Sequence, residues 1–171
     1  DVLGSRGLGD VYKRQEYEVL GIPVHKFCPE KDYTDTEIAV RLAMKLGAEK
    51  ITILGASEGN RLDHLFGNVM TMIVPQKAGI DCFMVDAHNR VRILTKPLEI
   101  RKEEQYGTYI SLIPLTTDVY GVTLSGFKYP LWDFHFNVLT SGSLGISNEL
   151  TEEYGKIDFS GGVLLMVESR D

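Results

Sequence analysis

Residues 50–56, KITILGA, decide the fold class of this chain. The run is rich in β-branched and other apolar side chains, and it ends at a glycine-containing turn. It is too short for a typical helix, and an uninterrupted apolar run of this length predicts a buried strand. The segments on either side of it indicate what kind of sheet this strand joins.

The segment before the strand has the periodicity of an amphipathic helix. Thr34 is a good N-cap, and Glu37 three residues later completes a capping box. Gly47 is expected to end the helix. Apolar side chains follow at helical spacing between these signals: Ile38, Ala39, Leu42, Ala43 and Leu46.

The segment after the strand predicts a second helix and another strand. The polar loop 57–64 leads into a helix with apolar residues on one side, which are Leu62, Leu65, Phe66, Val69 and Ile73. Residues 81–87, DCFMVDA, predict a further strand, and residues 24–27 predict an earlier one. The alternation of strands and helices predicts a parallel α/β unit with right-handed crossovers.

The pattern changes after about Asn89. Strand-like runs follow one another, separated by Gly, Pro, Ser and Asn, and no helical period persists for ten residues. The runs are RVRILT, TYISLIPL, VYGVTLSGF, HFNVLTS and GVLLMVES. This half of the chain therefore predicts an all-β sandwich or barrel.

These patterns divide the chain into three parts. Residues 16–88 are expected to form an incomplete α/β unit, a parallel sheet with crossover helices, and residues 89–171 the β-sandwich or barrel domain. Residues 1–15, DVLGSRGLGDVYKRQ, have no regular period, and their glycines fit no phosphate-binding motif. We expect this leader to be extraneous sequence and the first native strands to be missing.

Composition narrows the function classes. The chain has 171 residues, 43% of them hydrophobic, and a net charge of −6, which argues against a broad nucleic-acid-binding face. Cys28 and Cys82 lie too far apart for a metal knuckle or redox pair, so idle thiols in a reducing cytoplasm are expected. No apolar run is long enough to span a bilayer. We expect a cytoplasmic protein that binds neither nucleic acid nor membrane.

Residues 29–37, PEKDYTDTE, carry more charge than a helix start requires. Lys31, Asp32 and Asp35 surround the cap Thr34, at the sheet edge where ligands of parallel α/β folds bind. The helix N-terminus and Lys31 favour anions, and Asp32 and Asp35 suit Mg²⁺. Simple capping by Thr34 and Glu37, with aspartates that suit the helix dipole, is the alternative.

A second polar cluster, GNRLDH, occupies residues 59–64 between a strand and a helix. It contains Arg61, Asp63 and His64 within four residues. Asp63 as a helix cap is the alternative to a functional role. Both clusters follow strands of one inferred sheet, so we expect them to converge on one ligand site.

The third stretch is residues 141–149, SGSLGISNE. Its hydroxyl and amide groups suit hydrogen bonds to a small heterocycle, and a long polar turn is the alternative. Residues 126–134 before it are dense in aromatic side chains. We expect Trp132 to lie in the core, Asp81 and Asp86 to be turn residues, and His25, His88 and His135 to be structural or surface residues.

Together these stretches resemble the bacterial thiamine pyrophosphokinases. The matching pieces run in family order from about residue 16 to the end of the chain. They are PEKDYTDTE, GNRLDH with Asn68, SLIPLT at 111–116, GVTLSGFKYPL at 121–131, SLGISNE at 143–149 and GKIDFSGGVLLMVESRD at 155–171. Each piece alone is modest, but the ordered set is specific.

The resemblance implies an α/β domain for ATP, a β-sandwich for thiamine and a homodimer with thiamine sites at the subunit interface. It implies transfer of diphosphate from Mg-ATP to thiamine, with release of AMP. By position, Asp35 and Asp63 are implied catalytic residues, and Asp35 and Asp32 implied metal ligands. The implied neighbours of ATP are Lys31, Thr34, Arg61 and His64, and those of thiamine are Ser143, Ser147 and Asn148.

The chain departs from the family at one point. The family's Gly-Asp-x-Asp-Ser loop, which supplies Mg²⁺ ligands, is absent, because Gly9-Asp10 is followed by Val, Tyr and Lys. Membership of the family therefore does not require turnover by this chain, and a sheet without its first strands is expected to leave an unpaired edge. Two alternatives remain open: a module that binds thiamine or its diphosphate without turnover, and a nucleotide-dependent kinase of another small alcohol.

Overall fold

The computed structural model describes residues 19–20, 32–56 and 61–171. The chain divides into two compact units, residues 1–49 and 50–171, and each is described by itself. The expected strand at 24–27, the leader 1–15, Cys28 and Lys31 lie outside the described residues.

The first unit contains helix α2 (Asp35–Lys45), which begins and ends where the sequence predicts. The Thr34 side chain accepts a hydrogen bond from the Glu37 backbone N–H at 3.2 Å, while the Glu37 carboxylate binds Arg41 one turn on. At the other end, Gly47 takes a positive φ of 83°. Its N–H bonds the Met44 carbonyl and the next N–H bonds the Ala43 carbonyl, which is the Schellman arrangement that closes a helix.

The second unit is built on a six-stranded sheet with the order β1-β2-β3-β10-β5-β8. Its strands are β1 (Lys50–Leu54), β2 (Asp81–Val85), β3 (Asn89–Leu94), β5 (Tyr109–Pro114), β8 (Asn148–Glu149) and β10 (Leu164–Ser169). β1 and β2 pair in parallel and are joined through α3 (Leu62–Thr71) and α4 (Ile73–Lys77). The α/β crossover predicted from KITILGA is therefore present, while β3 and the later strands pair antiparallel.

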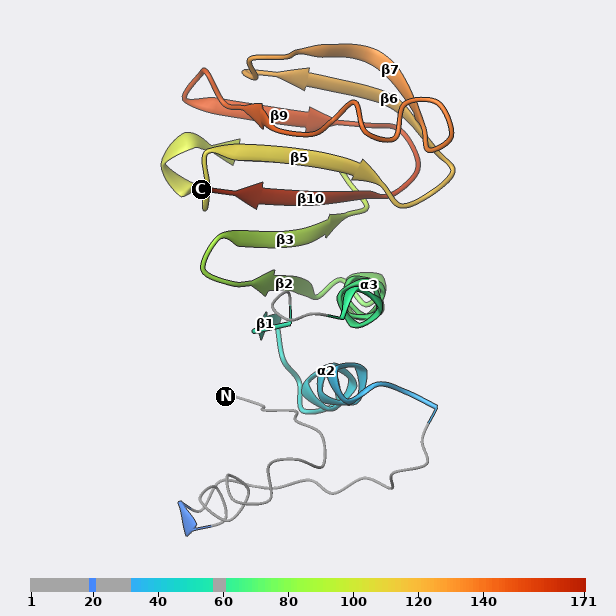
Figure 1. The fold of residues 1–171 in the computed structure, drawn as a ribbon, viewed down its shortest axis with the longest axis vertical. Helices are drawn as coiled ribbons and strands as arrows, with labels where there is room; N and C mark the ends of the chain where they lie inside the picture. The colour runs from blue at the N-terminus through green and yellow to red at the C-terminus, as the bar shows by residue number, and fades with distance from the viewer. Residues whose placement is uncertain (1–18, 21–31, 57–60) are drawn as a thin grey trace. The chain divides into compact units, whose positions relative to one another are not determined.

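A second sheet of four strands has the order β4-β9-β6-β7. The strands are β4 (Leu98–Arg101), β6 (Asp118–Ser125), β7 (Leu131–Asn137) and β9 (Tyr154–Asp158), and a short 3-10 helix, η1, covers Lys102–Glu104. The two sheets enclose one apolar core with side chains from both, including Ile110, Leu112 and Leu164 from the first and Val122 and Phe136 from the second. Figure 1 labels β6, β7 and β9 of the second sheet and β3, β5 and β10 of the first. The predicted α/β unit followed by a β-sandwich is confirmed.

The second predicted helix is broken into two. α3 ends at Thr71 and α4 begins at Ile73 because Pro75 has no N–H to donate to the Thr71 carbonyl. The predicted apolar side is also only partly buried. Val69 and Met72 are buried, whereas Leu62 and Phe66 are 69% and 62% exposed.

KITILGA was predicted to be a buried strand. It does form a strand, but only part of that strand is buried. Ile51 is buried and Thr52 and Leu54 are exposed, because β1 stands at one end of the sheet order and has one covered face. Among the described strands it pairs with β2 alone.

The prediction that Trp132 lies in the core is wrong, because its indole is 73% exposed. The register between β6 and β7 shifts twice, and Asp133 takes a positive φ of 46°. Trp132 and Asp133 are therefore exposed in succession, and Phe134 and Phe136 turn to the core. The predicted strand at 135–141 is likewise shifted, since β7 ends at Asn137 and a turn follows.

Candidate active site

The acidic start of α2 is the first candidate region. Asp32 is exposed and Asp35, in the first turn, is partly buried. The Thr34 hydroxyl caps the helix, so the capping interpretation of this residue is correct. Negatively charged side chains in this position interact favourably with the positive end of the helix dipole.

The second region is the start of α3. Arg61 stands at the N-cap position without a side-chain cap bond, and Asp63 lies inside the first turn. The two side chains form a bidentate ion pair, with Arg61 Nε 3.1 Å from Asp63 Oδ1. Both are more than 60% exposed. The hydrogen bond from Arg61 holds the pKa of Asp63 at about 2, below its ordinary value of 3.8, and the same contact raises the pKa of Arg61. His64, next along the helix, is exposed.

The two regions belong to different compact units. The structure describes the local geometry of each, and the expected convergence of Asp35 and Asp63 stays a prediction. In the described ranges, no group of three or more His, Cys, Asp or Glu side chains is arranged to hold a metal ion.

The third region is the turn between β7 and β8. Ser143 and Ser147 are exposed, and Ser147 has a positive φ of 56°. The Ser147 backbone N–H donates to Ser111 Oγ at 2.9 Å, and the Gly145 carbonyl accepts from the Leu112 N–H at 2.8 Å. These bonds attach the turn to β5 and leave both serine side chains at the surface.

Asn148 differs from the two serines because its side chain is buried. Its Oδ1 accepts from the Tyr129 N–H at 3.0 Å, and its Nδ2 donates to the Tyr129 carbonyl at 2.8 Å. The Asn148 amide thus bonds both the N–H and the carbonyl of Tyr129, in the aromatic segment 126–134. This side chain ties two of the sequence-matched segments together.

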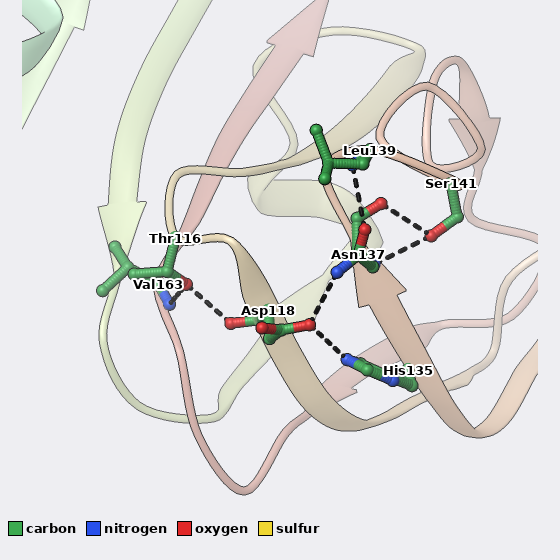
Figure 2. Close-up of polar contacts among 7 residues, drawn as sticks. All are labelled: Thr116, Asp118, His135, Asn137, Leu139, Ser141 and Val163. Atoms are coloured by element: carbon green, nitrogen blue, oxygen red, sulfur yellow. Dashed lines mark hydrogen bonds and ion pairs between the residues drawn. The ribbon is translucent and has the colours of Figure 1, made fainter.

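Sequence reasoning missed a polar cluster on β6 and β7. Asp118 Oδ1 accepts from His135 Nε2 at 2.7 Å and from Asn137 Nδ2 at 2.8 Å. Figure 2 shows the carboxylate between these two side chains. The hydrogen bond from Asn137, followed by that from His135, lowers the pKa of Asp118. A signal was present in the sequence, because His135 and Asn137 are two apart and share one face of a strand.

Among the described residues, no helix has the length and apolar character needed to cross a bilayer. Cys82 is buried, as expected, and burial raises the pKa of its thiol to about 12. Asp86 is a turn residue as predicted, since its carboxylate accepts from the backbone N–H groups of His88 and Asn89.

Comparisons with known proteins agree with this arrangement. The family model described as thiamin pyrophosphokinase, catalytic domain, matches residues 10–84, and the model described as thiamin pyrophosphokinase, vitamin B1 binding domain, matches residues 96–164. The thiamine pyrophosphokinase of Bacillus subtilis (strain 168) is 35% identical over 161 residues, which are 93% of this chain and 73% of that protein.

Solved structures give the same result. The crystal structure of the B. subtilis thiamine pyrophosphokinase superposes with a TM-score of 0.85 at 32% identity, covering 98% of this chain and 77% of that one. The thiamin pyrophosphokinase of Geobacillus thermodenitrificans superposes with a TM-score of 0.81 at 35% identity, covering 97% and 74%.

Fold and sequence thus define a protein with an α/β catalytic part and a β-sandwich that binds a small ligand. The chain belongs to the thiamine pyrophosphokinase family.

Proposed function

We propose that this chain transfers the terminal diphosphate of Mg-ATP to thiamine, giving thiamine diphosphate and AMP. The observation that carries the proposal is the presence of both family domains in order, catalytic at 10–84 and vitamin B1-binding at 96–164.

In the reaction, the hydroxyl oxygen of thiamine attacks the β-phosphorus of ATP. The bond from this phosphorus to the oxygen that bridges the α- and β-phosphorus breaks, and AMP leaves with that oxygen. The hydroxyl proton passes to a carboxylate. Such a transfer depends on alignment and charge neutralisation more than on covalent work by the protein.

We assign the phosphate side of the site to the two acidic turns. Asp35 and Asp32 would hold Mg²⁺, which neutralises phosphate charge when bound and takes its remaining ligands from phosphate oxygens and water. Lys31, Thr34, Arg61 and His64 would contact the phosphates.

The low pKa of Asp63 argues against a role for this residue as the proton acceptor. A carboxylate with a pKa of about 2 is a weak proton acceptor at neutral pH. We therefore assign proton acceptance to Asp35. Asp63 would act through its charge, by holding the Arg61 guanidinium toward the phosphates.

Thiamine would lie against the turn between β7 and β8. The exposed hydroxyls of Ser143 and Ser147 are available to the heterocycle. Asn148 would contribute at the base of this surface, where its buried amide fixes the backbone of Tyr129.

We further propose a homodimer with shared sites. Large apolar side chains stand exposed in this turn and in the segment 126–134, including Tyr129, Trp132, Leu139, Leu144 and Ile146. Exposed apolar groups of this size are typical of protein interfaces. Light scattering after size exclusion tests this, since Trp132→Ser should shift the molecule toward monomer while Lys156→Ser should not.

The activity test uses ATP with thiamine and a panel of other small alcohols. AMP and thiamine diphosphate formed in equal amounts are expected, and ADP release with another alcohol would favour the rival kinase. Asp35→Asn should lower kcat by on the order of 10²-fold or more, because a proton acceptor is lost. Glu49→Gln, an exposed carboxylate beyond the end of α2, is the matched control and should leave kcat unchanged.

Calorimetric titration with thiamine, with and without Mg-ATP, tests the remaining alternative. Heat of binding without any product would identify a thiamine-binding module. Cell fractionation tests the proposed cytoplasmic location.

A further inference from the structure

The cluster around Asp118 connects three segments that are distant in the chain. Thr116, just before β6, donates its hydroxyl proton to the Asp118 carbonyl at 2.7 Å and accepts from the Val163 N–H at 3.1 Å. The Asp118 carboxylate then holds His135 and Asn137 of β7. Residues near 116, 135 and 163 are fixed to one another at this end of the four-stranded sheet (Figure 2).

Asn137 also forms hydrogen bonds with residues of the turn that follows it. Its N–H donates to Ser141 Oγ at 2.9 Å, and its carbonyl accepts from the Ser141 N–H at 2.8 Å. Its Oδ1 accepts from the Leu139 N–H at 3.0 Å, while its Nδ2 is held by Asp118. Each of these hydrogen bonds of Asn137 goes either to Asp118 or to the turn.

The turn is then anchored at its far end by β5. The Leu144 N–H bonds the Ser141 carbonyl at 3.0 Å, and the Gly145 carbonyl and Ser147 N–H bond β5. Ser143 and Ser147 therefore stand on a segment that is attached at Asn137 and at β5, and the Val138 N–H also donates to the Thr117 carbonyl at 2.9 Å. Of these attachments, the one at Asn137 includes a hydrogen bond to a charged side chain, that of Asp118.

The attachment of Asn137 to Asp118 is strengthened by the charge of the carboxylate and by the geometry of the strands. Hydrogen bonds to an ionised carboxylate are stronger than neutral ones, and Asp118 directs two of them to one oxygen. The His135 ring also stacks on Tyr120 at 4.6 Å between centroids, which holds the imidazole over β6. The carboxylate is 28% exposed, so water competes with it only in part.

We propose that Asp118 is a positioning residue for the thiamine-binding turn: through Asn137 it fixes residues 137–147 in the conformation that presents Ser143 and Ser147 to the substrate. This inference rests on the proposed function and adds a residue that touches neither substrate. It acts on thiamine binding and leaves the ATP side of the reaction unaffected.

The test compares three variants in steady-state kinetics. Asp118→Ala should raise KM for thiamine on the order of tenfold, with KM for ATP within twofold, because one charge-assisted anchor is lost. Asp118→Asn keeps an acceptor oxygen but loses the charge, and it should recover part of that loss. Asp158→Ala, on the same sheet, removes a surface carboxylate paired with Lys156 and should behave as wild type. Equal changes in both KM values, or no change in either, would overturn the proposal.

Amide hydrogen exchange provides a readout that does not need turnover. Residues 138–147 should exchange faster in Asp118→Ala than in wild type, and β5 and β10 should not. Unchanged exchange in the turn would refute the positioning role even if activity fell. If the wild-type chain makes no thiamine diphosphate, the proposed function fails on its own, and the exchange experiment still decides whether Asp118 orders the turn.

Discussion

Replacing Glu168 by alanine tests how the six-stranded sheet is held together. Glu168 lies on β10 with 1% of its surface exposed. Its carboxylate accepts from Arg90 Nε at 2.6 Å, Arg90 Nη2 at 2.7 Å and the Tyr106 N–H at 3.1 Å. Truncation removes the acceptor of the Arg90 guanidinium and of the Tyr106 N–H. These contacts join β10 to β3 and to the segment after η1.

The expected cost follows from burial. Removing one partner of a buried ion pair destabilises a protein by about 3–5 kcal/mol. The Arg90 side chain is 29% exposed and also donates to the Glu104 carbonyl at 2.9 Å, so it can regain some hydration and keep one bond. We therefore expect the lower end, about 3 kcal/mol, or a fall in Tm on the order of 10 °C for a chain of this size.

Urea denaturation followed by far-UV circular dichroism measures this free energy of unfolding. The matched control is Asp158→Ala. The Asp158 carboxylate lies 3.1 Å from the ammonium group of Lys156, which is exposed, so its loss should lower the free energy of unfolding by less than about 1 kcal/mol. The double variant Arg90→Met/Glu168→Leu removes both charges and should recover most of the loss. A Glu168→Ala variant within 1 kcal/mol of wild type, or a double variant as unstable as the single one, would refute the reasoning.

Three further predictions concern single sites. Carbon-detected NMR should give Asp63 a pKa of about 2, and this pKa should rise toward 3.8 in Arg61→Gln. Because the pKa of Asp63 is lower in the folded than in the unfolded chain, the ion pair stabilises the fold above about pH 4. This stabilisation is lost as the pH falls through 2. In a Cys28→Ser background, Cys82 should not react with a thiol reagent until the protein unfolds, because its pKa is about 12 and it is buried. Gly126→Ala should destabilise the fold by more than 1 kcal/mol, because φ is 79° and the new Cβ would meet the Tyr154 carbonyl.

Each of these has a clear contrary result. An Asp63 titration near 4 would mean that the ion pair with Arg61 does not form in solution. Rapid labelling of native Cys82 would mean that β2 opens readily. Gly79→Ala is the control for Gly126, because its φ of 75° is similar and nothing lies within 4 Å of its Cβ position. Equal costs at the two glycines would show that backbone strain alone, without the contact, explains the loss.

Features set by neighbouring residues were predictable from the sequence. The Thr34 cap and the Gly47 termination depend on side chains within a few positions, and both are present. The strands predicted at 50–56 and 81–87, each from a short apolar run, are present at 50–54 and 81–85 and pair in parallel. The break before Ile73 was also readable, since Pro75 interrupts the helical hydrogen bonds.

Features set by distant pairing were not predictable in the same way. Trp132 is exposed because β7 shifts its register against β6, and alternation along one strand does not reveal a bulge that the partner strand creates. Asp118 meets His135 across 17 residues, so neither residue is conspicuous alone. Asn148 was matched to the family turn by position, but its buried contact with Tyr129 required the fold.

The same distinction applies to the candidate site. Local spacing suggested Arg61 and Asp63 as one cluster, and the structure pairs them. The low pKa of Asp63 followed only from the contact geometry, and it argues against Asp63 as the proton acceptor.

The most direct test of the proposed activity is a single label-transfer experiment. The purified chain is incubated with thiamine, Mg²⁺ and ATP carrying ³²P in the β-position, and the products are separated. Transfer of a diphosphate predicts the label in thiamine diphosphate, with unlabelled AMP formed in equal amount. Label that stays in ADP or in ATP, with no labelled thiamine diphosphate, would contradict it.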